Sequence, residues 1–182
     1  FTWFEVQLNC QSLNIYGATL VGSPFIGIGF NDDIGWAHTN NVHDGQDLYK
    51  LILTDPGYKW EDDIKLFNKR VVQIKIKQNN GGLRIEEFLI KESIHGPIIR
   101  EDGKYAYALR VVGQDQPFVF EQYFDMALSK NFDQFEKAIS RLQNPFFTTM
   151  YADRDGRIMH LFGGRTTDRP KGDWNWLGTV PG

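Results

Sequence analysis

Histidine, cysteine and carboxylate side chains are the residues of this chain that could perform acid–base, nucleophilic or metal chemistry. Two of the four histidines, His38 and His43, are five residues apart, and no HExxH or CxxC spacing of a zinc site occurs. Cys10 is the single cysteine, and no neighbouring base would make its thiol a nucleophile. The glycines between Gly22 and Gly35 lie in strand-like surroundings rather than in a phosphate-binding loop. Residue types and spacing alone therefore predict a β-rich domain and no particular chemistry.

Two blocks of sequence are more informative than these isolated residues. The first runs from Gly29 to Gln46 as GFNDDIGWAHTNNVHDGQ and continues into DLY, and the second runs from Tyr151 to Ile158 as YADRDGRI with glycines at 163 and 164. These blocks resemble the signatures of the penicillin acylase (penicillin amidase) family of N-terminal-nucleophile hydrolases, which includes acyl-homoserine-lactone acylases. The resemblance extends over nearly all of the chain through GSP at 22–24, HGP at 95–97 and WLGTVP at 176–181.

The resemblance also implies what this chain lacks. In the family a precursor cleaves itself, a serine becomes the first residue of the large subunit, and its α-amine is the base that activates its hydroxyl. Phe1 is not that serine, and the motifs place it some tens of residues after the nucleophile. The chain also stops before the segment that carries the family's side-chain oxyanion donor. We therefore expect residues 1–182 to be an internal fragment of the large subunit, inactive alone.

Within the first block, the resemblance assigns one oxyanion donor. The family uses the backbone N–H of the residue after Trp-x-x-Thr, and here Trp36-Ala37-His38-Thr39 is followed by Asn40. A backbone N–H suits this role because it is held in place without side-chain entropy. The alternative is that Asn40 simply ends a strand and begins a turn.

The resemblance further places four residues in the wall of an acyl pocket: Ile28, His38, Tyr123 and Phe147. Such a lining favours hydrophobic acyl chains through buried area, worth roughly 25 cal/mol per Å². The penicillin G acylases have a small polar residue where this chain has His38, so the chain looks more like the members that take aliphatic acyl groups. The alternative for each of the four residues is ordinary core packing.

Asp44, Gln46 and Asp47 match the place where many family members bind a structural calcium ion. Two carboxylates three residues apart, with a carbonyl between them, suit Ca²⁺ but are too few to hold it alone. Solvated carboxylates in a turn are the alternative, and the reaction requires no cofactor. The resemblance implies a periplasmic or extracellular parent protein. Its partners would be the acyl-amide substrate, the small subunit and the remainder of the large subunit.

The elements that must position these residues are mostly strands. The clearest, Val71–Lys77, alternates with a period of two and is expected to form a hairpin through Asn79–Gly82 with Leu83–Ile90. Asp153 and Asp155 are interpreted as turn formers of a second hairpin. The other predicted strands are Thr2–Leu8, Leu13–Leu20, Phe25–Phe30, Ile34–Thr39, Leu48–Leu53, Tyr105–Val112, Phe146–Ala152 and Arg157–Phe162.

Two helices interrupt the strands. Apolar residues recur at intervals of three and four from Phe120 to Ala127, and a second stripe runs from Phe132 to Leu142 after Asn131, a candidate N-cap. Strands, two helices and further strands predict an α+β fold with antiparallel sheets. The resemblance makes it part of the αββα sandwich of N-terminal-nucleophile hydrolases. Because no linker or repeat divides the chain, a single fragment is expected.

Composition narrows the classes of partner. Apolar residues make up 41% of the chain, and twenty basic against twenty-three acidic residues leave a net charge of −3 without a basic block. We therefore expect no nucleic acid partner, and no apolar run has the roughly eighteen residues of a membrane span. Sheet edges that the missing segments would cover predict self-association of the fragment. A non-catalytic structural or binding module remains the alternative function.

Overall fold

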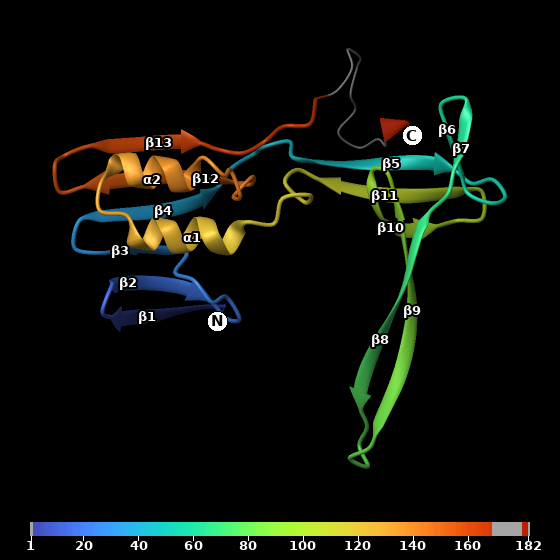
Figure 1. Ribbon diagram of the computed structural model, residues 1–182, viewed down its shortest axis with the longest axis horizontal. Coiled ribbons are helices and arrows are strands. Elements are labelled where there is room, and N and C mark those ends of the chain that lie inside the picture. The colour runs from blue at the N-terminus through green and yellow to red at the C-terminus, as the bar shows by residue number, and fades with distance from the viewer. Residues whose placement is uncertain (1, 169–179, 182) are drawn as a thin grey trace. The chain divides into compact units, whose positions relative to one another are not determined.

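The computed structural model describes residues 2–168 and 180–181 and contains two compact units (Figure 1). Among the described residues, the first unit consists of residues 2–45 and 112–168, and the second consists of residues 46–111 with 180–181. The chain leaves the first unit after Gly45 and returns at Val112, whose N–H donates to the Gly45 carbonyl at 2.9 Å. The segment Trp176–Thr179 of the last predicted motif lies outside the described residues.

An antiparallel sheet forms the base of the first unit. Its strands are β1 (Trp3–Cys10), β2 (Leu13–Leu20), β3 (Ile28–Phe30), β4 (Ile34–Asn40), β12 (Phe147–Asp153) and β13 (Ile158–Phe162), in this spatial order. Hairpins or short loops join successive neighbours, except where the chain leaves after β4 and comes back at β12. This arrangement confirms the predicted antiparallel α+β fold.

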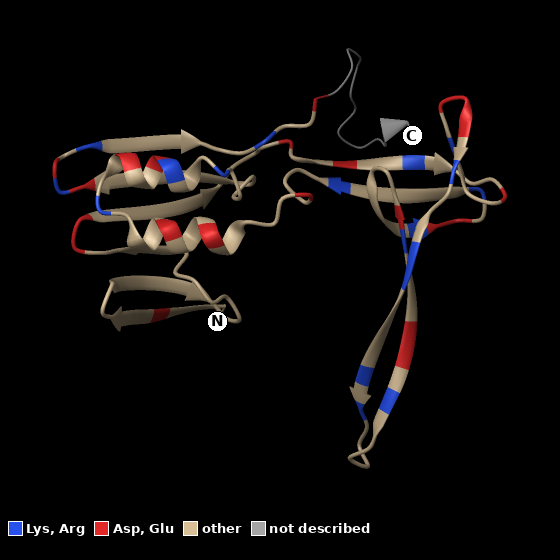
Figure 2. Ribbon diagram, viewed as in Figure 1, with Lys and Arg blue, Asp and Glu red and all other residues tan. Residues whose placement is uncertain are grey.

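Two helices, α1 (Val119–Leu128) and α2 (Phe132–Ile139), cover one face of this sheet (Figure 1). Asn131 is the N-cap of α2 as predicted, and its side-chain oxygen accepts from the Gln134 N–H at 3.0 Å. The predicted stripe through Leu142 was too long, because α2 ends at Ile139 and Leu142 has a φ of +53° that no α-helix contains. The outward faces of both helices carry charged residues (Figure 2).

The core of the first unit lies between the sheet and the helices. Its buried residues come from both layers: Trp36 and Tyr151 from β4 and β12, and Phe135 from α2, whose ring centroid is 4.6 Å from that of Tyr151. Arg141 extends the contact between the helices by an ion pair with Asp125 of α1. The helices are therefore fixed on the sheet, and so are the side chains that α1 directs toward it.

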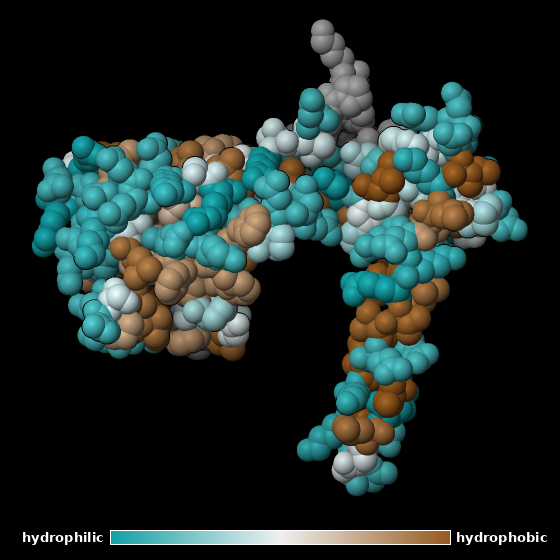
Figure 3. Space-filling model, viewed as in Figure 1, coloured by the Kyte–Doolittle hydropathy of each residue, from teal (hydrophilic) through white to brown (hydrophobic). Residues whose placement is uncertain are grey.

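The second unit contains a further sheet. Its strands in spatial order are β14 (Val180–Pro181), β5 (Gln46–Ile52), β11 (Tyr105–Val111), β10 (Gly96–Glu101), β9 (Leu83–Ser93) and β8 (Asn68–Lys77), and β6 (Tyr58–Trp60) pairs with β7 (Asp63–Lys65). The predicted hairpin of β8 and β9 is confirmed, with Gly81 at a φ of +83° in its turn. Strands β6, β7 and β10 were not predicted. Figure 3 shows apolar surface along the β8–β9 hairpin.

The HGP motif of the second unit has a structural explanation. His95 is buried, stacks on Tyr49 with ring centroids 3.7 Å apart, and meets Trp60 edge to face at 4.9 Å. Gly96, the first residue of β10 after the turn at residues 94 and 95, adopts a φ of +138°, which residues with a side chain disfavour. No helix among the described residues is long and apolar enough to cross a membrane.

Candidate functional site

The two signature blocks lie on neighbouring strands of the first unit. Strand β4 of the first block pairs antiparallel with β12 of the second, so that His38 lies opposite Thr149. The adjacent loops are joined as well, because the Arg154 N–H donates to the Asp33 carbonyl at 3.0 Å and the Arg154 guanidinium is 3.0 Å from the Asp33 carboxylate. Asp153 accepts from the backbone N–H groups of residues 155 and 157, as expected for a turn former.

Asn31 of the first block connects this sheet to helix α1. Its side-chain oxygen accepts from the N–H groups of Asp33 and Ile34, both at 2.9 Å, which closes the turn before β4. Its amide nitrogen donates to the carbonyls of Ala127 and Ser129, at 3.0 and 2.8 Å. These two carbonyls lie at the C-terminal end of α1, where the helix itself supplies no N–H donor for them. Asn31 therefore fixes the position of α1 relative to β4.

The four residues predicted to line an acyl pocket surround a single cavity of about 190 Å³. Ile28 and His38 come from the sheet, Tyr123 from α1, and Phe147 from the start of β12. Tyr123 is buried, whereas Phe147 is 37% exposed. The lining also includes Trp3, Thr19, Leu20, Ser23, Phe25, Gly27, Val119 and Asn144. Most of this surface is apolar, which suits a hydrocarbon group.

A short chain of hydrogen bonds crosses the wall of this pocket. His38 Nδ1 is 3.0 Å from the Thr149 hydroxyl, and His38 Nε2 is 3.3 Å from Asn144 Nδ2. The same Asn144 amide group donates to the Tyr123 hydroxyl. Because an amide nitrogen can only donate, His38 Nε2 accepts from Asn144 in this arrangement, and the proton of the neutral ring is on Nδ1. The four side chains therefore hold one another in one arrangement.

His38 is neutral in this arrangement. Burial lowers the pKa of its imidazole from 6.5 to about 4, because the charged form loses its hydration there. The rings of Tyr123 and Phe147 meet the imidazole edge to face, with centroid distances of 5.5 and 6.2 Å. A neutral ring with both nitrogens occupied serves as wall and support rather than as a proton acceptor. Burial also raises the pKa of the Tyr123 hydroxyl.

The backbone N–H of Asn40 points away from β12. The Asn41 N–H donates to the Phe146 carbonyl at 3.0 Å, so the odd-numbered residues of β4 bond to β12 and Asn40 is turned to the opposite side. On that side β3 pairs with β4 at Gly35 and Trp36, further from the end of the strand. The Asn40 N–H is therefore directed past the beginning of β3, the side from which Ile28 enters the pocket.

Sequence patterns did not indicate Thr149, Asn144 or Phe25 as members of the site. Thr149 is separated from His38 by 111 positions and Asn144 by 106, so the contacts arise only when β12 pairs with β4. The register of β4 and β12 is the signal that would have found Thr149, since it lies directly opposite His38.

The sequence as a whole matches a known family. A family model described as penicillin amidase matches residues 1–182. The chain belongs to the penicillin amidase family.

Relatives within the family are considerably longer than this chain. The acyl-homoserine lactone acylase PvdQ of Pseudomonas syringae pv. syringae (strain B728a) is 28% identical over 160 residues, which cover 82% of this chain and 20% of that protein. The acyl-homoserine lactone acylase QuiP of Pseudomonas aeruginosa is 24% identical over 192 residues, 93% of this chain and 22% of that protein. The chain thus spans about a fifth of these relatives.

A solved structure supports the same fold. The thermostable penicillin G acylase from Alcaligenes faecalis superposes with a TM-score of 0.83 and 20% sequence identity. The match covers all of this chain and 33% of that one. The sheets, antiparallel except for the pairing of β14 with β5, and the two helices therefore share the fold of that penicillin G acylase.

The predicted calcium ligands, Asp44, Gln46 and Asp47, do not all point toward one common position. Gln46 and Asp47 are successive residues of β5, so their side chains leave opposite faces of the strand; the first is exposed and the second buried. Asp44 lies in the preceding loop. Within residues 2–168 and 180–181, no three His, Cys, Asp or Glu side chains are grouped to hold a metal ion. A calcium role for these residues stays a prediction.

Proposed function

We propose that the complete protein containing this chain hydrolyses the amide bond of N-acyl compounds, and that this chain supplies the acyl pocket and one oxyanion donor. One observation carries the proposal. The apolar pocket around His38 and the Asn40 N–H occupy adjacent positions on one strand, and the N–H is turned away from the neighbouring strand β12. A bound acyl chain and its carbonyl oxygen need these two features side by side.

In the proposed reaction, the acyl chain enters the pocket and its carbonyl carbon lies near the end of β4. A serine hydroxyl from outside this chain adds to that carbon, as the family resemblance implies, and its proton passes to the departing amine. The negative oxygen of the tetrahedral intermediate accepts from the Asn40 N–H. Water then releases the acyl group as a carboxylic acid. His38 holds the shape of the pocket and takes no proton in these steps.

An unbranched aliphatic acyl group is the substrate class that best fits the lining. His38, Tyr123 and Phe147 leave an apolar space of about 190 Å³ without an exposed charged partner for a polar acyl substituent. Relatives in the family are named acyl-homoserine lactone acylases. We therefore propose N-acyl-homoserine lactones rather than penicillin G, whose acyl group is aromatic, and a periplasmic or extracellular location of the complete protein.

The test uses the complete protein and a series of N-acyl amides with short, medium and long chains, including acyl-homoserine lactones. Hydrolysis of at least one member is expected, with release of free fatty acid. Two variants at one position then test the oxyanion donor. Asn40→Pro deletes the N–H and should lower turnover by about a hundred- to a thousand-fold, whereas Asn40→Ala keeps it and should change turnover little.

Both variants must fold and show unchanged autocatalytic processing for this comparison. If the proline variant hydrolyses amides as fast as the alanine variant, Asn40 does not bind the oxyanion. A complete, processed protein that hydrolyses none of the amides but binds them would instead be the non-catalytic binding module that was the alternative.

A further inference from the structure

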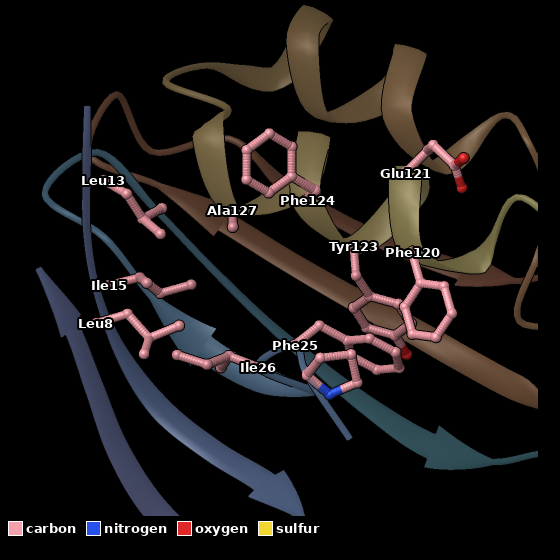
Figure 4. A pocket seen from close by; sticks show the side chains of 11 residues that line it. Leu8, Leu13, Ile15, Phe25, Ile26, Phe120, Glu121, Tyr123, Phe124 and Ala127 are labelled. Atoms are coloured by element: carbon pink, nitrogen blue, oxygen red, sulfur yellow. The ribbon is translucent and has the colours of Figure 1, made fainter. Parts of the chain in front are cut away.

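A second apolar cavity lies beside the pocket, and the same two rings line both. This groove has a volume of about 420 Å³ and lies between strands β1 and β2 and helix α1 (Figure 4). Phe25 and Tyr123 line the groove and the pocket alike. Their rings are stacked, with centroids 4.0 Å apart and planes inclined by 10°. In Figure 4 the pair lies at one end of the groove, with Leu8 and Leu13 toward the other.

The stacked rings of Phe25 and Tyr123 form a partition between the pocket and the groove. The two rings are held in place differently. Tyr123 is 6% exposed, and its hydroxyl accepts a hydrogen bond from Asn144. The Phe25 ring is half-buried, packs against the core, and contacts Tyr123 and, edge to face with centroids 5.8 Å apart, Phe120, but a phenyl ring has no polar group that a hydrogen bond could hold. The backbone of Phe25 is fixed, since its carbonyl accepts from the buried Thr19 hydroxyl at 2.5 Å. The Phe25 side chain is therefore the less constrained of the two, and its rotation would open the space between the pocket and the groove.

The groove suits the end of a hydrocarbon chain. Leu8, Leu13, Ile15 and Phe124 supply apolar surface, and Glu121 is the charged residue of the lining, apart from these side chains in Figure 4. A hydrocarbon chain needs no hydrogen-bonding partner from such a surface, and the groove shares the Phe25 and Tyr123 rings with the pocket around His38.

We infer that Phe25 determines the length of acyl chain that the site accepts, by separating the pocket from the groove. The inference rests on the proposed acyl-binding function. Short chains end against the Phe25 ring within the pocket. Longer chains displace this ring and place their distal methylenes in the groove. Truncation of Phe25 joins the two cavities permanently and removes the discrimination against long chains.

The test measures binding of saturated fatty acids, the products of the proposed reaction, to the complete protein by titration calorimetry. In Phe25→Ala the affinity for long chains relative to short chains should rise about tenfold or more, since a few methylenes gain a binding surface. Phe25→Leu should give a smaller rise and serves if the alanine variant fails to fold. Phe30→Ala is the matched control, because Phe30 contacts Tyr16 in the same sheet and lines neither cavity.

A substitution in the groove itself tests whether the acyl chain lies there. Leu8 lies on β1 in the groove, away from the pocket, and is 39% exposed, so that Leu8→Trp fills the groove without disturbing a buried position. Added to Phe25→Ala, it should cancel the gain for long chains and leave short chains unaffected. A folded Phe25→Ala and Phe25→Leu pair with an unchanged preference for chain length would overturn the inference.

Binding and hydrolysis separate the two proposals. Hydrolysis of acyl amides without any shift in chain-length preference in the Phe25 variants would support the function and refute the role of Phe25. A shift in fatty-acid binding by a protein that hydrolyses no amide would support the role of Phe25 and refute the function.

Discussion

At the scale of single residues, the pocket is a hydrogen-bonded set rather than a collection of apolar side chains. His38 depends on Thr149 for its Nδ1 and on Asn144 for its Nε2, and Tyr123 shares the Asn144 amide. A buried polar group that loses its partner costs about 1–3 kcal/mol, so each member keeps the others in place. This explains how a histidine can form part of the wall of a mostly apolar cavity.

The lowered pKa of His38 predicts a specific sensitivity to acid. The folded chain holds this imidazole neutral with a pKa of about 4, whereas the unfolded chain protonates it near 6.5. Its contribution to stability is therefore complete above pH 6.5 and is lost as the pH falls toward 4. By pH 5 the free energy of unfolding should drop by roughly 2 kcal/mol through this group.

Urea unfolding of the chain at a series of pH values measures this effect. His38→Gln should remove the contribution of this histidine to the pH dependence of the free energy of unfolding between pH 6.5 and 4. The pH dependence that His95 contributes should remain. Burial, and to a lesser extent the charges of Arg110 and Lys65, lower the pKa of His95 to about 4 as well. Identical pH profiles for the wild type and His38→Gln would contradict the proposed neutral state of His38.

Part of this site could be predicted from the sequence. The resemblance placed Ile28, His38, Tyr123 and Phe147 in one pocket, and the structure brings them together around one cavity. Asn144 could not be predicted, since an asparagine before a proline reads as a loop residue and its two partners are distant in the sequence. Polar contacts across a fold leave no periodic signal.

At the scale of elements, periodicity predicted the long strands and both helices. The strand that was expected from Phe25 begins at Ile28, because the Phe25 carbonyl bonds to the Thr19 side chain and leaves the ladder. Strands β6 and β7 have three residues each, too few to show a period, and β10 follows directly from the turn at Gly96. Pairing with neighbouring strands, rather than a periodic pattern in the local sequence, therefore defines β6, β7 and β10.

Asn31 and Asn131 permit a comparison of two capping residues. Asn31 accepts from two N–H groups and donates to two carbonyls at the end of α1, whereas Asn131 accepts from a single N–H at the start of α2. Asn131→Ala should lower the free energy of unfolding by about 1 kcal/mol. Asn31→Ala should lower it by roughly 2–4 kcal/mol, because it leaves four groups without a partner.

Denaturant unfolding of both variants under the same conditions gives the comparison. Asn79→Ala, in the exposed turn between β8 and β9, is the control for removing an asparagine side chain. Equal losses for Asn31→Ala and Asn131→Ala would show that Asn31 does not couple the turn before β4 to α1.

At the scale of the molecule, the proposed reaction divides its parts: this chain would supply the pocket and one oxyanion donor, and the family resemblance implies that a serine outside it is the nucleophile. The matched part of this chain covers about a fifth of the length of its relatives, and the family resemblance places the serine before this region. We therefore predict that the purified 182-residue chain hydrolyses no acyl amide above the buffer rate. Turnover of a chromogenic acyl anilide, by a preparation shown to be free of host acylase, would contradict the assignment of the nucleophile.

The β8–β9 hairpin predicts how the isolated chain behaves at high concentration. Val71, Ile74, Leu83, Ile85, Phe88 and Leu89 are 44–65% exposed on its two strands. Strand β8 is the last strand of the second sheet among the described residues, so its free edge and these side chains offer a surface for another copy. We predict self-association through this hairpin.

Sedimentation velocity over a range of concentrations measures the association. Ile74 and Phe88 lie on one face of the hairpin, because Val72 pairs with Phe88 and Ile74 is two residues further along. Ile74→Lys combined with Phe88→Glu should shift the chain toward the monomer. Val42→Lys removes a loop residue that is 88% exposed and should leave the association unchanged. A wild-type chain that stays monomeric, or a Val42→Lys variant that dissociates as readily as the hairpin variant, would exclude the hairpin as the contact surface.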